Sequence, residues 1–120
     1  MKRKELTDSE LKFAELIWAN APIASMDLVR LSEAEMGWKK STTFSMLKIL
    51  GVKGIIKHER PLVSVVMTKD DYLERHCRNY IEDTFGGSLP KFLTSFMWHE
   101  RMSDKQAEEL KRLIDDYKEE

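Results

Sequence analysis

A cluster of basic and hydroxyl side chains between residues 36 and 60 carries the clearest chemistry in the sequence. This segment has six Lys or Arg residues against one acidic residue, a net charge of +5. Cationic side chains neutralise phosphates, and hydroxyls can contact phosphates or base edges. The candidate DNA-binding residues are Lys39, Lys40, Ser41, Thr42, Ser45 and Lys48, followed by Lys57, His58 and Arg60. The segment therefore predicts binding to double-stranded DNA.

The elements expected around these side chains favour DNA binding over the plainer interpretation of a solvated helix. Residues 40–53 have the pattern of an amphipathic helix, and Gly54 is suited to end it in a left-handed turn. Two β-branched runs follow at residues 55–58 and 62–67, separated by Glu59-Arg60-Pro61. A helix that leads into a hairpin is typical of a winged helix-turn-helix, in which the helix enters a DNA major groove.

Two helices are predicted upstream as the scaffold of this segment. The first begins with a capping box of Thr7 and Glu10, and the second runs from Ser25 to about Met36-Gly37. The side chains predicted to face the core are Phe13, Ala14, Ile17, Trp18 and Ala21, then Leu28, Val29 and Leu31, and in the third helix Thr43, Met46, Leu47 and Leu50. The fold class is predicted to be mainly α with a small β-hairpin, and the winged-helix domain is predicted to span residues 1–68.

Two apolar residues of the third helix, Phe44 and Ile49, fall outside its inward face. Neither side chain can hydrogen-bond a base. Phe44 can contact a thymine methyl group or pack against another element of the domain, and packing is slightly favoured.

Residues 69–120 are predicted to form a three-helix dimerisation domain. The three helices begin with the capping residues Thr68, Ser88 and Ser103, and Gly86-Gly87 ends the first of them. Each helix has a wide apolar stripe, and a segment of about 50 residues cannot easily cover all three. The side chains predicted to meet a second copy are Tyr80, Phe85, Leu89, Phe92, Leu93, Phe96, Met97, Leu110, Ile114 and Tyr117.

The charge distribution agrees with this division of the 120 residues. Residues 1–67 have 11 basic and 8 acidic side chains, whereas residues 68–120 have 9 basic and 13 acidic ones. A basic first half suits a polyanionic partner, and an acidic second half suits a protein partner. No apolar run is long enough to span a membrane, and a single cysteine fits a reducing compartment. The sequence predicts a cytoplasmic protein without membrane insertion.

Catalytic and metal-binding chemistry has little support. His76 and Cys77 are neighbours on a predicted helix, so their side chains point about 100° apart and cannot face one ion or act as a Cys–His pair. Cys77 lies on the apolar stripe and is interpreted as a core side chain. The sequence also has no Gly-rich phosphate loop, since Gly86-Gly87 separates two helices. We expect no enzyme activity, no metal and no cofactor.

Four segments resemble the penicillinase repressor family, the BlaI/MecI group, over nearly the whole chain. They are LTDSELKFAELIWANAPIASMDLV, GWKKSTTFSMLKIL, DDYLERHCRNYIEDTFGGSLPKFLTSF and SDKQAEELKRLIDDY. The resemblance implies a homodimeric repressor with a winged-helix domain, bound to a palindromic operator. It also implies a membrane sensor protease as a partner, which cuts members of the family between an Asn and a Phe. The matching positions here are Ser95 and Phe96.

Two other function classes stay open. A winged helix can lose DNA binding and serve as a protein-interaction module, which the apolar Phe44 and Ile49 would suit. A small-ligand-sensing regulator would instead need a pocket between the aromatic helices of residues 69–120.

Overall fold

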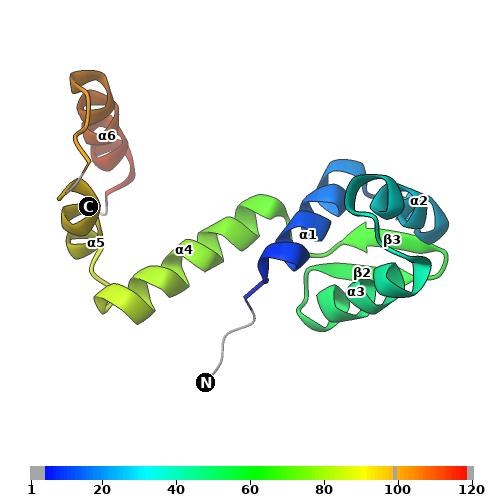
Figure 1. The fold of residues 1–120 in the computed structure, drawn as a ribbon. Helices are drawn as coiled ribbons and strands as arrows, with labels where there is room; N and C mark the ends of the chain where they lie inside the picture. Colours follow the sequence, from blue (N-terminus) through cyan, green and yellow to red (C-terminus); the bar gives the residue numbers. More distant parts are fainter. Residues whose placement is uncertain (1–4, 99, 119–120) are drawn as a thin grey trace. The chain divides into compact units, whose positions relative to one another are not determined.

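The computed structural model describes residues 5–98 and 100–118, and it divides into two compact units (Figure 1). The first unit ends at Cys77 and the second begins at Arg78. The elements are α1 (Asp8–Asn20), β1 (Ile23–Ala24), α2 (Ser25–Met36), α3 (Lys40–Val52), β2 (Ile56–Glu59), β3 (Leu62–Val65), α4 (Lys69–Phe85), α5 (Leu89–Met97) and α6 (Asp104–Tyr117). The predicted fold class, mainly α with a small antiparallel sheet, is confirmed.

In the first unit, three helices pack against one another and against a three-stranded sheet. The strand order is β1-β3-β2, and both strand pairs are antiparallel. Helix α3 lies beside β2, as Figure 1 shows. The fully buried large side chains are Phe13, Ile17, Leu28, Leu47, Leu50, Ile55, Val63, Thr43 and Ser32. This is the helix–helix–helix–hairpin order of a winged helix-turn-helix.

The predicted capping signals fix the ends of several helices. At α1, the Glu10 N–H donates to Thr7 Oγ1 (3.3 Å) and the Thr7 N–H donates to Glu10 Oε1 (3.1 Å), which completes the capping box. Ser103 and Gln106 form the same arrangement at α6. After α3, Gly54 has a φ of 81°, a left-handed conformation that glycine adopts without steric cost. This turn directs the chain from α3 into the wing.

Two details of the first unit differ from the expectations. The two-residue strand β1 was not predicted, and it pairs Ile23 with Val63 and Ala24 with Leu62. In α2, Ser32 is fully buried, whereas Leu31, which was predicted to face inward, is only half-buried. Helix α2 therefore turns the small Ser32, and not Leu31, into the core.

The start of α4 belongs to the first unit. Tyr72 is buried, its hydroxyl accepts a hydrogen bond from the Leu6 N–H (3.1 Å), and its ring lies 6.0 Å from that of Trp18. The Trp18 indole N–H in turn donates to the Met67 carbonyl (2.9 Å). These contacts anchor the first turn of α4 to α1. The predicted domain boundary between residues 68 and 69 stays a prediction.

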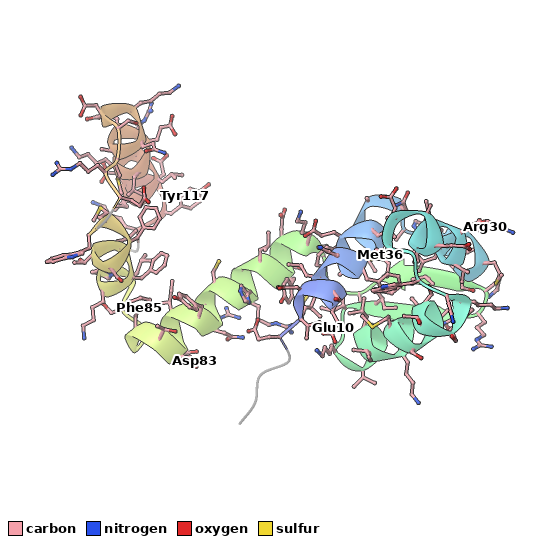
Figure 2. The ribbon with its side chains drawn as sticks, viewed as in Figure 1. Glu10, Arg30, Met36, Asp83, Phe85 and Tyr117 are labelled. Atoms are coloured by element: carbon pink, nitrogen blue, oxygen red, sulfur yellow. The ribbon has the colours of Figure 1, made fainter. Side chains whose placement is uncertain are left out.

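The second unit leaves its apolar side chains largely exposed. Among the residues of α5 and α6, all of which the structure describes, no side chain is buried. Only one internal cluster stands out, in which the rings of Tyr80, Phe85 and Phe92 meet edge to face at 5.7–6.3 Å. Phe85 and Tyr117 are labelled in Figure 2, and Tyr117 is 82% exposed. Within residues 78–98 and 100–118, the fold therefore lacks a hydrophobic core of its own.

Cys77 corrects one sequence interpretation. We expected a core side chain, but Cys77 is exposed in this chain. The residue of α4 that packs into the first unit is Tyr72, which lies off the stripe containing Cys77 and Leu73. Separately, no helix in the part of the chain that the structure describes is long and apolar enough to cross a membrane.

Candidate nucleic-acid interface

The N-terminus of α3 is arranged to attract anions. Its N-cap, Lys39, provides no side-chain cap, and the first turn contains no acidic residue. By contrast, α1, α5 and α6 each begin with a hydroxyl cap from Thr7, Ser88 or Ser103, and α2, which also lacks a side-chain cap, has the acidic Asp27 in its first turn. Lysines beside the positive end of a helix dipole are locally unfavourable unless an anion lies nearby. The start of α3 is therefore less stable than a capped helix start, and its electrostatic potential is positive.

The outward face of α3 carries every candidate residue predicted on this helix. The inward face, made by Thr43, Leu47 and Leu50, is buried in the core. The exposed candidates on the opposite side are Lys39, Lys40, Ser41, Thr42, Ser45 and Lys48. Since side chains four residues apart share a helix face, Lys40 and Lys48 lie in one row, with Phe44 between them.

The wing consists of β2 and β3 with a turn at Arg60-Pro61. Arg60 and Lys57 are exposed, and Lys57 Nζ lies 3.2 Å from Glu59 Oε1. His58 is half-buried, and burial together with the nearby Arg60 charge lowers its pKa below the usual range. Both effects favour the neutral imidazole. Among the candidate wing residues, Arg60 and Lys57 supply the positive charge.

Phe44 joins α3 to the wing, whereas the sequence predicted only that it packs against some other element of the domain. Its ring centroid lies 5.8 Å from that of His58, 5.2 Å from the Arg60 guanidinium carbon and 5.9 Å from Lys40 Nζ. Phe44 is half-buried and packs against the core cluster, so the slight preference for packing is confirmed. Beside it, an open groove of about 480 Å³ lies between α3 and the wing and is lined by Lys48, His58 and Arg60, among others.

Lys53 contributes to the charge of the segment but not to this surface. Its ammonium lies 2.5 Å from Glu10 Oε1 and also donates to the Glu5 carbonyl (2.8 Å). Both side chains of the pair are largely buried, at 23% and 10% exposed. Lys53 therefore ties α3 to α1. The helical pattern of α3 could not show this contact, because the partners are 43 residues apart in sequence.

The predicted dimerisation residues all lie in the second unit at exposed or half-buried positions. Tyr80, Leu89, Phe96, Met97, Ile114 and Tyr117 are 42–82% exposed, and Phe85, Phe92, Leu93 and Leu110 are half-buried. Ser95 and Phe96, the positions that match the family's cleavage site, are both exposed near the end of α5.

His, Cys, Asp and Glu side chains are the possible metal ligands over the described part of the chain. Across residues 5–98 and 100–118, no three His, Cys, Asp or Glu side chains gather closely enough to hold an ion. The candidate binding surface of the first unit is the cationic face formed by α3 and the wing.

Comparisons with known proteins assign the chain to a family. The penicillinase repressor model matches residues 6–116. The penicillinase repressor of Bacillus licheniformis is 22% identical over 121 residues, covering 98% of this chain and 94% of that protein. The methicillin resistance regulatory protein MecI of Staphylococcus aureus (strain Mu50) is 20% identical over 117 residues, covering 94% of this chain and 95% of that protein. The chain therefore belongs to the penicillinase repressor family and is a winged-helix transcriptional repressor.

Proposed function

We propose that the protein acts in the cytoplasm as a homodimer that binds a palindromic operator and represses the adjacent promoter. In each subunit, α3 enters the major groove and the wing contacts the DNA backbone beside it. The observation that most supports this proposal is a cluster of two cations. Lys40 of α3 and Arg60 of the wing both lie against the ring of Phe44. Both relatives are named as a repressor or a regulatory protein, and the proposal extends that role to this chain.

The exposed apolar faces of α5 and α6 support the homodimer. A second copy would cover them, and a twofold dimer requires a twofold operator. Two recognition helices about one DNA turn, or ~34 Å, apart would bind half-sites whose centres are ~10 bp or a multiple of 10 bp apart.

The proposed route to derepression is proteolysis in α5 between Ser95 and Phe96 by a membrane sensor protease. Both positions are exposed in the chain, and the second unit around them has little core to resist local opening. We expect mass spectrometry of the protein from cells in which the target gene has been switched on to detect a new C-terminus at Ser95. A full-length protein in cells whose target gene has been switched on would contradict this route.

Selection of duplexes tests the proposed function as a whole. The full-length chain is incubated with genomic fragments and with a randomised duplex library at physiological salt, and the bound DNA is sequenced. We expect a palindrome with the half-site spacing given above, in front of at least one gene. Recovery of no consensus sequence, with affinity no better than for calf thymus DNA, would contradict a sequence-specific repressor.

Replacing Lys48 with alanine should separate phosphate contacts from sequence readout. Lys48 is exposed on α3, and its ammonium is suited to phosphate. We expect Lys48→Ala to weaken binding about equally for the selected palindrome and for a scrambled duplex. The slope of log affinity against log salt should fall by ~1 per subunit.

The matched variants are Thr42→Ala and Ser45→Ala, which remove hydroxyls nearer the start of α3. They should relax sequence preference while leaving the salt slope almost unchanged. If Lys48→Ala changes neither affinity nor slope in fluorescence anisotropy titrations, the outward face of α3 does not contact DNA.

A further inference from the structure

The ring of Phe44 is contacted by side chains from two separate elements. Lys40 lies one helical turn before it on α3, whereas His58 and Arg60 come from β2 and the turn of the wing. The His58 ring is tilted against the Phe44 ring at an interplanar angle of 36°, and the two cations lie within cation–π range. The tip of the wing is thereby placed against the middle of α3.

The aromatic ring of Phe44 can attract the cations of Lys40 and Arg60, which an aliphatic side chain cannot do. The face of a phenyl ring carries negative electrostatic potential, which attracts cations. Lys40 and Arg60 have like charges and long, flexible side chains, so without the ring they would separate and sample many rotamers in water. The lowered pKa of His58 suits this arrangement, because a third positive charge beside Arg60 would oppose it.

We propose that Phe44 is a positioning residue that pairs Lys40 of the recognition helix with Arg60 of the wing before DNA binds. This inference rests on the proposed function and extends it to a residue that does not itself need to touch DNA. Lys40 and Arg60 would then meet the phosphate backbone as a preformed pair. Ordering a rotamer-rich side chain on binding carries an entropic cost that lowers affinity. Holding two of them in place beforehand should therefore raise affinity by about tenfold.

The test uses Phe44→Leu, which keeps an apolar side chain but removes the ring, and Phe44→Tyr, which keeps the ring. Met46→Leu is the matched control, because Met46 is also half-buried on α3 but is not part of the cationic cluster. The probe is the palindromic duplex selected with the wild-type chain. We expect Phe44→Leu to lower affinity about tenfold, and Phe44→Tyr and Met46→Leu to stay within about twofold of wild type.

A double-mutant cycle distinguishes positioning from a merely structural role. Arg60→Ala is measured in the wild-type and in the Phe44→Leu backgrounds. If the ring positions Arg60, Arg60→Ala should cost several-fold less affinity once the ring is absent. Equal costs in the two backgrounds would overturn the proposal.

A second cycle avoids any change at Phe44, in case Phe44→Leu unfolds the domain. Lys40→Ala, Arg60→Ala and the double variant are compared on the same duplex. Because both cations share one ring, their effects should be non-additive, and strictly additive effects would overturn the proposal. If the wild type selects no palindrome, the proposed function itself fails, and that result is distinct from failure of either cycle.

Discussion

Replacing Phe96 with aspartate is expected to convert the proposed homodimer into monomers and to lower operator affinity by about 10²- to 10⁴-fold. Phe96 is 54% exposed in the single chain, on a helix that buries no side chain within the chain itself. A partner that covers this position would have to bury an unpaired carboxylate, which is strongly unfavourable. Two linked winged-helix units bind two half-sites with a high effective concentration, and the monomer loses that advantage.

Sedimentation equilibrium at micromolar concentration and anisotropy titrations of the selected duplex measure the two effects. Thr94→Asp is the matched control, since it adds the same charge to α5 about half a turn away from Phe96 and at an exposed position. We expect Thr94→Asp to remain dimeric. A wild-type protein that sediments as a monomer would remove the basis of the homodimer, and a dimeric Phe96→Asp would exclude Phe96 from the interface.

Local signals made the fold predictable. The Thr7–Glu10 capping box and the left-handed turn at Gly54 each involve residues within a few positions of one another. Such interactions are encoded in short sequence windows, so helix starts and ends can be recognised without tertiary information. The strand β1 was not predicted, because its two residues, Ile23 and Ala24, are too few to show an alternating pattern.

The candidate site was only partly predictable, because its key contacts link distant residues. Helical periodicity correctly placed Lys40 and Lys48 on the outer face and Leu47 on the inner one. It left Phe44 unexplained, since no pattern within α3 indicates that Arg60 of the wing lies above the ring. This contact also provides a reason for an apolar residue at position 44, which had motivated the alternative of a protein-interaction module.

The charge of the segment was likewise a poor guide to how each cation is used. The six basic residues between residues 36 and 60 look alike in sequence. In the structure, however, Lys53 is paired with Glu10, and Lys57 lies beside Glu59. Only the folded chain distinguishes a cation that stabilises the domain from one that remains available to phosphate.

Replacing Lys53 with methionine should destabilise the first unit by about 2–3 kcal/mol at pH 7. Glu10 of α1, labelled in Figure 2, is buried. Its carboxylate accepts from Lys53 Nζ (2.5 Å) and from the Thr7 N–H (3.1 Å). Removing one partner of a buried ion pair leaves the other charge uncompensated, which costs about 3–5 kcal/mol when burial is complete. The smaller value expected here reflects the partial exposure of Lys53, at 23%.

The pH dependence of unfolding identifies the cause of this loss. Burial alone would raise the pKa of Glu10, but the hydrogen bonds from Lys53 and Thr7 and the Lys53 charge hold it below its usual value. A lowered folded-state pKa stabilises the wild type above the unfolded-state pKa of about 4.3, and this contribution is lost as the pH falls through the folded-state value. In Lys53→Met the burial effect is less opposed, so the pKa of Glu10 rises and protonation relieves the buried charge.

Urea unfolding of the two proteins at pH 7 and at pH 4 therefore gives a specific expectation: the difference in unfolding free energy should shrink at the lower pH. The exposed Lys12 of α1 provides the control, because Lys12→Met removes the same charge without unpairing Glu10. The double variant Lys53→Met/Glu10→Gln removes both charges, keeps an amide oxygen to accept from the Thr7 N–H, and should recover much of the lost stability. A Lys53→Met deficit that is equally large at both pH values would show that lost packing of the lysine stem, and not the unpaired carboxylate, destabilises the domain.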